Sequence, residues 1–195
     1  MTGDDQTNVY AIDESGHLLW RQERIYGPRE VPEPIEQFAG ILDTGLADLD
    51  GDGEREVIVS TRSGEVAALS ARGERLWRWS SYERKLGVTL NEGARMAFAD
   101  LDDDGKLEVV LSEQDSYLCV LDHRGRQKWA YLGGFFYHQY PVIGDLLGTG
   151  ELNIVWTSGE QNGTYALRTG TRGRPGRVPW PMMRGSLTRS NTAPW

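Results

Sequence analysis

The sequence repeats itself, and the spacing of these repeats constrains the fold more than any other feature. Three decapeptides share two apolar residues, a glycine at the sixth place and a tryptophan at the tenth: AIDESGHLLW (11–20), ALSARGERLW (68–77) and VLDHRGRQKW (120–129). Two acidic segments also match each other, DLDGDGERE (48–56) and DLDDDGKLE (100–108), and DLLGTGELN (145–153) is a degenerate third copy. Such self-similarity predicts stacked copies of one supersecondary unit.

The acidic segments and the tryptophans keep a fixed register. In both complete copies 29 positions separate the first aspartate from the tryptophan, Asp48 from Trp77 and Asp100 from Trp129. The first aspartates of successive segments lie 52 and then 45 positions apart, the third being Asp145. One unit therefore contains both an acidic loop and a tryptophan.

Each unit has the features of four short strands. EVIVS and LEVVLS are β-branched, apolar and bounded by turn residues, which is typical of strands. A run of small residues precedes each acidic loop (TGLADL, RMAFADL, PVIGDL), and the glycine of each decapeptide suits a tight hairpin. Repeated four-stranded units of this length predict propeller blades. We therefore expect an all-β fold, a β-propeller of four-stranded antiparallel blades.

The register also predicts where the blades lie. The chain is expected to contain a half blade at 1–23, blades at 44–80, 95–132 and 139–184, and a tail at 185–195. Propellers usually have about four to eight blades, so three and a half to four make a partial or small one. The favoured interpretation is the C-terminal part of a longer propeller. The alternatives are completion by another chain, or closure of a small four-bladed ring by the C-terminal segment.

The acidic loops have the features of a calcium site without an EF-hand. Alternating aspartates followed by a glycine can direct carboxylates toward one hard cation. An EF-hand needs a glutamate at position 12, which is Val59 in the first loop and Leu111 in the second. The further acid stands instead at position 9, as Glu56 and Glu108, and a strand follows.

These loops resemble the FG-GAP/VCBS group of calcium-binding β-propeller repeats. The resemblance implies two Ca²⁺ sites and no other cofactor. The implied ligands are Asp48, Asp50, Asp52 and Glu56 with the carbonyl of Glu54, and Asp100, Asp102, Asp104 and Glu108 with the carbonyl of Lys106. The third loop has Leu147, Thr149 and Asn153 at the later ligand places, so we expect it to stay metal-free.

The decapeptides are similar to the tryptophan-docking repeats of quinoprotein-like (PQQ-like) propellers. The segment VPWPMMRGSLTRSNT (178–192) is similar to one that often borders such domains. Trp20, Trp77 and Trp129 are therefore expected to pack between blades.

Composition excludes several classes of partner. The formal net charge of -8 argues against nucleic acid, which needs a basic surface. No apolar run approaches the ~20 residues of a membrane-spanning helix, and the polar N-terminus is no signal peptide. The single cysteine, Cys119, lies in an apolar strand-like run, so we expect its thiol to be buried.

Function is less sharply predicted. The motifs HExxH, GxSxG and the P-loop are absent, so no catalytic residue is assigned. A cluster of Tyr137, His138, Gln139 and Tyr140 is a candidate surface for a ligand or partner. We expect a non-enzymatic, calcium-braced binding or assembly module, part of a larger extracellular or periplasmic protein or complex. A partner protein or a second copy would complete the propeller, with carbohydrate as a further candidate. The alternative is an enzyme on a similar scaffold, of the quinoprotein dehydrogenase or polysaccharide lyase type.

Overall fold

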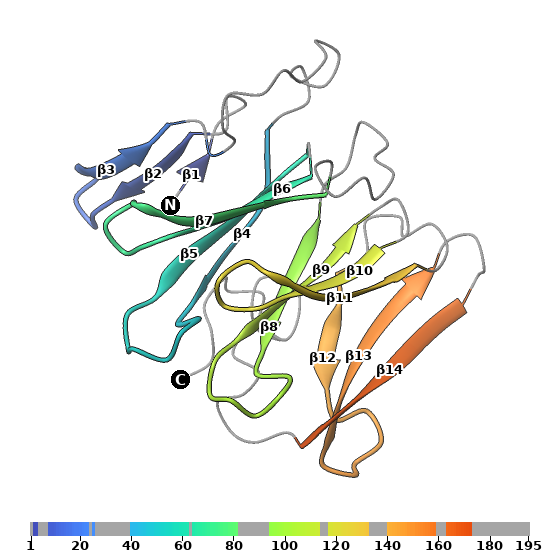
Figure 1. Cartoon of the computed structure of the whole chain (residues 1–195). Helices are drawn as coiled ribbons and strands as arrows, with labels where there is room; N and C mark the ends of the chain where they lie inside the picture. Colours follow the sequence, from blue (N-terminus) through green and yellow to red (C-terminus); the bar gives the residue numbers. More distant parts are fainter. Residues whose placement is uncertain are drawn as a thin grey trace.

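The computed structural model consists of strands joined by turns. It describes residues 2–3, 8–23, 25, 40–62, 64–81, 94–113, 117–132, 140–158 and 163–172. Their strands form four antiparallel sheets that follow one another along the chain (Figure 1). Within these ranges no helix has the length and hydropathy needed to cross a membrane. The expected all-β class is confirmed.

Each sheet is built from consecutive strands. The first contains β1 (Thr2–Gly3), β2 (Val9–Ile12) and β3 (Leu18–Gln22); the second β4 (Ile41–Ala47), β5 (Glu56–Thr61), β6 (Glu65–Leu69) and β7 (Arg75–Ser80); the third β8 (Arg95–Ala99), β9 (Glu108–Glu113), β10 (Tyr117–Leu121) and β11 (Gln127–Leu132); the fourth β12 (Val142–Gly144), β13 (Glu151–Ser158) and β14 (Gly163–Arg172). The two-residue strand β1, which pairs with β2, was not predicted from the sequence. The expected last strand of the fourth unit, beyond residue 172, and the tail lie outside the described residues.

The sheets pack face against face, which explains the continuous apolar runs of the middle strands. Every residue of β5 and β6 is buried. Because side chains alternate along a strand, Val57 and Val59 contact the cluster shared with the first sheet, while Ile58 belongs to the cluster shared with the third. A strand covered on both faces needs no polar alternation. Cys119 is buried in the same interface as Ile58, as predicted.

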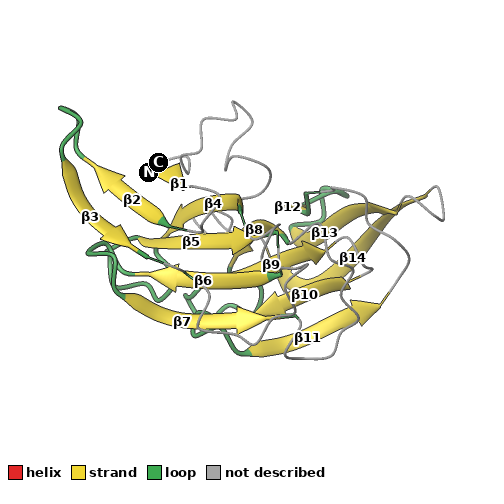
Figure 2. Cartoon of the chain, turned by 90° about the horizontal axis from the view of Figure 1, so that it is seen from above, coloured by secondary structure: helices red, strands yellow, loops and turns green. Residues whose placement is uncertain are grey.

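The first strand of each of the last three sheets lies at one common edge. In the second and third sheets β4 and β8 are terminal in the strand order, and β8 contacts both β4 and β12. Figure 2, which looks from above, shows β4, β8 and β12 on one side of the molecule and β7 and β11 on the other. The sheets therefore fan out from this common edge, which we call the inner edge.

At the opposite, outer edge, tryptophans connect neighbouring sheets. Trp20 of β3 donates its indole N–H to the carbonyl of Ala71 at 2.9 Å, in the β6–β7 turn of the second sheet. Trp77 of β7 donates in the same way to His123 at 2.8 Å, in the β10–β11 turn of the third sheet. The expected packing of these tryptophans between units is confirmed. Trp129 packs against the cluster between the third and fourth sheets.

Candidate metal centre

Three acidic loops occupy equivalent places, each joining the first strand of a sheet to the second. The first loop follows β4, the second follows β8 and the third follows β12, so all three lie at the same end of the inner strands. In the first loop Gly51 and Gly53 have positive φ values of 80° and 93°, which glycine adopts without strain. The second loop places Asp103, with φ 68°, where the first has Gly51.

In the first loop, the leading aspartate organises the turn. Asp48 Oδ1 accepts hydrogen bonds from the backbone N–H groups of Gly51 (2.8 Å) and Asp52 (3.1 Å), and Oδ2 accepts one from Gly53 at 2.9 Å. These bonds fix the carboxylate inside the loop. The negative charge is thus held beside the neighbouring carboxylates rather than left free to turn into solvent.

The glutamate at the start of β5 completes the group. Glu56 is only 6% exposed and its Oε2 accepts the N–H of Leu49 at 2.7 Å. Carboxylate oxygens of Asp48, Asp50 and Glu56 all lie within 4.8 Å of one another. Burial raises the pKa of Glu56; the Leu49 N–H opposes this rise, and the charges of Asp50, Asp48 and Asp52 add to it. Such a group favours a bound cation, which would offset both effects.

The second loop repeats this arrangement. Asp100 accepts backbone hydrogen bonds from Asp103 (2.7 Å) and Gly105 (3.2 Å), and Glu108 Oε2 accepts the N–H of Leu101 at 2.7 Å. Oxygens of Asp100, Asp102 and Glu108 again lie within 4.8 Å of one another. The structure thus brings together three of the four predicted acidic ligands in each loop.

The fourth predicted acid in each loop stays outside these groups. Asp52 Oδ1 accepts the N–H of Glu54 at 2.7 Å, and Asp104 Oδ1 accepts the N–H of Lys106 at 2.8 Å. Coordination by the carbonyls of Glu54 and Lys106 stays a prediction. The donor sets are entirely of oxygen and rich in carboxylates, which fits Ca²⁺ better than softer metals.

A lysine side chain lies among the carboxylates of the second loop, and the sequence analysis did not predict it. Lys128 of β11 donates to Asp102 Oδ2 at 2.5 Å and to Glu108 Oε1 at 3.1 Å. Burial lowers the pKa of Lys128, but the two hydrogen bonds and charges of these acids outweigh it, so that the pKa is raised. The only sequence signal was its position directly before the repeated tryptophan.

The third loop keeps the turn while losing the acids. Asp145 accepts backbone hydrogen bonds from Thr149 (3.0 Å) and Gly150 (2.6 Å), and Asn153 Oδ1 accepts the N–H of Leu146 at 3.1 Å. The described residues include no metal-ligand group in this loop. Backbone N–H groups thus bond to the Asp145 and Asn153 side chains and hold this turn without a group of carboxylates.

The first two loops touch each other. The backbone N–H of Leu107 donates to the carbonyl of Leu49 at 2.9 Å, which joins the second sheet to the third. A β-carbon added at Gly51 would lie 3.1 Å from the carbonyl oxygen of Gly105. Anything that fixes the geometry of the first loop therefore also fixes how these two sheets meet.

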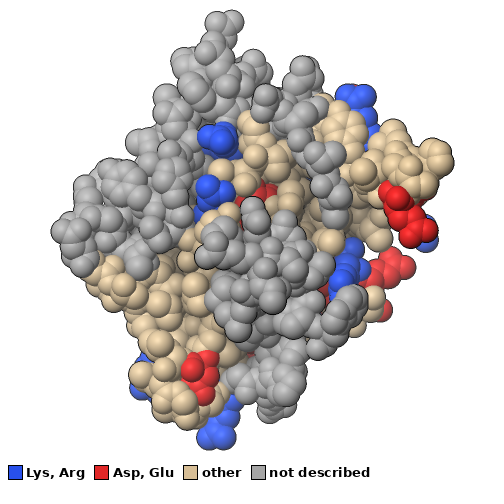
Figure 3. All heavy atoms as spheres, turned by 180° about the vertical axis from the view of Figure 1, so that it is seen from behind, with Lys and Arg blue, Asp and Glu red and all other residues tan. Residues whose placement is uncertain are grey.

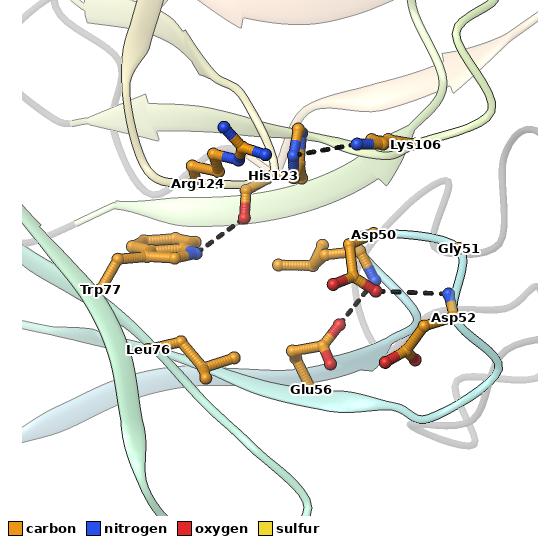
Figure 4. A pocket seen from close by; sticks show the side chains of 10 residues that line it. Asp50, Gly51, Asp52, Glu56, Leu76, Trp77, Lys106, His123 and Arg124 are labelled. Atoms are coloured by element: carbon orange, nitrogen blue, oxygen red, sulfur yellow. Dashed lines mark hydrogen bonds between the residues drawn. The ribbon is translucent and has the colours of Figure 1, made fainter.

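A pocket of about 550 Å³ lies beside the first loop. Asp50 and Glu56 face it from one side, while Leu76 and Trp77 line another part of its wall (Figure 4). Across it stand Lys106, His123 and Arg124, with Lys106 Nζ 3.4 Å from His123 Nε2. On the face seen in Figure 3, the described Lys and Arg side chains form separate small groups rather than one basic surface.

Of the predicted partner surface, only Tyr140 lies inside the described residues; Tyr137, His138 and Gln139 lie outside them. Tyr140 lies at the inner edge, where Arg95 Nη1 is 3.3 Å from its hydroxyl and the guanidinium is 5.1 Å from its ring centre. Arg95 also donates to the carbonyl of Leu42 at 3.1 Å, across to the second sheet. This tyrosine is thus part of the packing between sheets.

A carboxylate at the inner edge, that of Asp43, was also not predicted from the sequence. Asp43 of β4 accepts the N–H of Met96 of β8 at 3.2 Å and that of Thr44 at 3.0 Å. Burial raises the pKa of Asp43 to about 6, against these two hydrogen bonds and the charge of Arg95. A partly buried carboxylate thus bridges the second and third sheets.

Comparison with known proteins identifies the repeat. Residues 48–111 match the family model of the FG-GAP-like repeat, which includes both complete acidic loops. The predicted FG-GAP identity is therefore confirmed for this stretch. No curated protein sequence matches the chain.

Solved structures similar to the chain include two bacterial proteins. The Vibrio cholerae biofilm matrix protein Bap1 is 23% identical with a TM-score of 0.46, over 75% of this chain and 26% of that one. A rhamnogalacturonan lyase of Bacillus licheniformis is 15% identical with a TM-score of 0.43, over 71% of this chain and 36% of that one. The chain thus spans about a quarter to a third of their lengths.

Proposed function

We propose that this chain with FG-GAP-like repeats is a segment of a β-propeller braced by calcium, and that it serves as a non-enzymatic binding or assembly module. The four sheets would be successive blades, with β4, β8 and β12 nearest the propeller axis. Supporting this, successive sheets share a common inner edge and the tryptophan contacts recur at the outer edge. The repeat match over residues 48–111 agrees with the same arrangement.

The observation that carries the proposal is the joining of the two acidic loops. Leu49 lies beside Asp48 in the first loop, and its carbonyl accepts the N–H of Leu107 from the second. An ion held by Asp48, Asp50 and Glu56 would rigidify that carbonyl and with it the contact between sheets. The carboxylates Asp48 and Glu56 also hydrogen-bond to their own turn, which suits a structural role better than a catalytic one.

The proposed partner would act at the two end sheets. Within the described residues the first and fourth sheets have three strands each, while the second and third have four. The edge strand of a sheet can pair with a further strand through its backbone groups. We propose that a second copy, another protein or a further part of the same protein completes them. Ca²⁺ sites of moderate affinity suit an extracellular or periplasmic location, where millimolar calcium is available.

Native mass spectrometry with and without a chelator tests this function. The proposal predicts calcium bound to the chain and an assembly larger than one chain, with the assembly weakened when the chelator removes the metal. A chain that carries no calcium at millimolar concentration would contradict the bracing. A calcium-loaded chain that stays monomeric and binds neither protein nor glycan would contradict the module.

A further inference from the structure

The two complete acidic loops differ in what neutralises their charge. Both contain three aspartates and a glutamate in the same spacing, and each holds an oxygen of the first two aspartates and of the glutamate within 4.8 Å of one another. Equal sequence motifs would predict equal metal affinity. However, the last strand of each sheet, β7 or β11, differs at the position directly before its tryptophan, where the side chain faces the acidic loop.

In the second loop the chain supplies its own cation. The Lys128 ammonium is hydrogen-bonded to Asp102 and Glu108, and the Glu108 side chain is only 1% exposed. Glu108 therefore has both oxygens engaged, one by Lys128 and the other by the N–H of Leu101. A metal ion that uses these oxygens must displace the lysine.

In the first loop that counter-ion is missing. The repeat register of 52 positions places Leu76 where the second loop has Lys128, and Leu76 precedes Trp77 as Lys128 precedes Trp129. No described residue forms an ion pair with Asp48, Asp50 or Glu56. Although Glu56 is only 6% exposed, no described residue donates a hydrogen bond to its second oxygen, Oε1.

The first loop is also open to an incoming ion. Asp50 and Glu56 line the 550 Å³ pocket, with Leu76 on its wall at the place of Lys128 (Figure 4). Lys106 and Arg124 line the pocket as well, but neither forms an ion pair with Asp50 or Glu56. The Glu56 carboxylate has one oxygen open to the pocket and lies beside two further carboxylates, so a cation bound there would offset their mutual repulsion. The second loop shows that a positive charge does occupy this position of the repeat.

We propose that the first loop is the principal calcium site of the chain and that Lys128 acts as a tethered counter-ion that weakens calcium binding to the second. Lys128 is thus a residue that sets metal affinity, although it is not a ligand. This inference rests on the calcium bracing proposed above. Repulsion between an ammonium and a divalent ion a few ångströms apart, at low effective dielectric, makes a difference of about tenfold or more in affinity.

Isothermal titration calorimetry with calcium tests the proposal on the wild-type chain and on two variants, Lys128→Met and Leu76→Lys. The wild type is expected to bind one ion at least about tenfold more tightly than a second. Lys128→Met removes the charge, keeps most of the side-chain volume, and is expected to raise the affinity of the weaker site toward that of the stronger one. Leu76→Lys is expected to lose the tight site, because the new ammonium can reach Asp50 and Glu56. Circular dichroism of each variant checks that it is folded.

The outcomes separate the two proposals. Two equal sites in the wild type, unchanged by Lys128→Met, would overturn the counter-ion role and leave calcium bracing intact. A tight site that Asp50→Asn leaves unchanged would overturn the assignment of that site to the first loop, and with it the bracing through Leu49. No calcium binding by the wild type or by Lys128→Met would overturn both the counter-ion role and the bracing.

Discussion

Substituting Gly125 with alanine tests how the sheets are fastened at their outer edge. Gly125 lies in the β10–β11 turn with φ 74°, and an added β-carbon would lie 2.5 Å from Cε3 and 2.6 Å from Cδ2 of Trp77. Both distances are too short for a real contact, so the indole ring must move. Its hydrogen bond to His123, 2.8 Å long, would be strained or lost.

The magnitude follows from three contributions. A non-glycine residue at positive φ costs about 1 kcal/mol, the indole hydrogen bond contributes about 1 kcal/mol, and forced repacking of an aromatic costs about 1 to 3 kcal/mol. Gly125→Ala should therefore destabilise the protein by about 3 to 5 kcal/mol. For a domain of this size that corresponds to a fall in Tm of roughly 6 to 20 °C.

Gly16 provides a matched control. Its turn has the same backbone hydrogen bonds, Gly16 N–H to Asp13 at 3.1 Å as against Gly125 N–H to Asp122 at 2.9 Å. Its φ is 87°, but an added β-carbon would meet no heavy atom within 4 Å. Gly16→Ala should therefore cost only the conformational strain, about 1 kcal/mol.

Denaturant unfolding, followed by tryptophan fluorescence, measures the free energy of unfolding of the wild type, Gly125→Ala and Gly16→Ala. A double-mutant cycle with Trp77→Ala adds a second reading: in the Gly125→Ala background, losing Trp77 should cost less than it does in the wild type, because the ring is already displaced. Equal destabilisation by Gly16→Ala and Gly125→Ala, together with no coupling in the cycle, would refute the reasoning.

Three further predictions concern the loops and the inner edge. The pKa of Asp43 in the native state, about 6, exceeds its usual 3.8, so the protein should lose up to about 3 kcal/mol of stability as pH rises from about 4 to 7. Denaturant unfolding at these pH values should show the loss, and Asp43→Asn should remove this pH dependence. Calcium at a hundredfold excess over Kd should stabilise the protein by about 2.7 kcal/mol and so raise its Tm, and Asp48→Asn should abolish most of this rise. Asp145→Asn in the third loop should lower Tm equally with and without calcium. Trp20→Phe should lower the free energy of unfolding by about 1 kcal/mol, since it removes the indole donor to Ala71, and an unchanged value would contradict a role for that bond.

The repeat register predicts much of the fold because it is a local property of each unit. The strand-like runs of 56–61 and 108–113, the acidic loops and the glycine hairpins all depend on residues close in sequence. The packing of Trp20 and Trp77 was also predicted, since a residue repeated in register makes the same contact in each copy. These features needed no knowledge of distant contacts.

Other features depend on contacts that the sequence pattern does not encode. Strand β1 has only two residues and no periodicity, so nothing distinguished it from a loop. Lys128 reaches Asp102 from 26 positions away, and Asp43 meets Met96 from 53 positions away. A lysine before a tryptophan gave no sign of its partner in a loop of the same sheet, and an aspartate in a strand gave no sign of its partner in the neighbouring sheet.

Hydrogen exchange at the Leu107 amide tests the central claim most directly. This N–H donates to the Leu49 carbonyl and is the described backbone hydrogen bond between the first two loops. If an ion in the first loop fixes how the second and third sheets meet, saturating calcium should slow exchange of this amide by about tenfold or more relative to chelator. The slowing should disappear in Asp50→Asn. An exchange rate at Leu107 that is the same with calcium as without it would contradict the account.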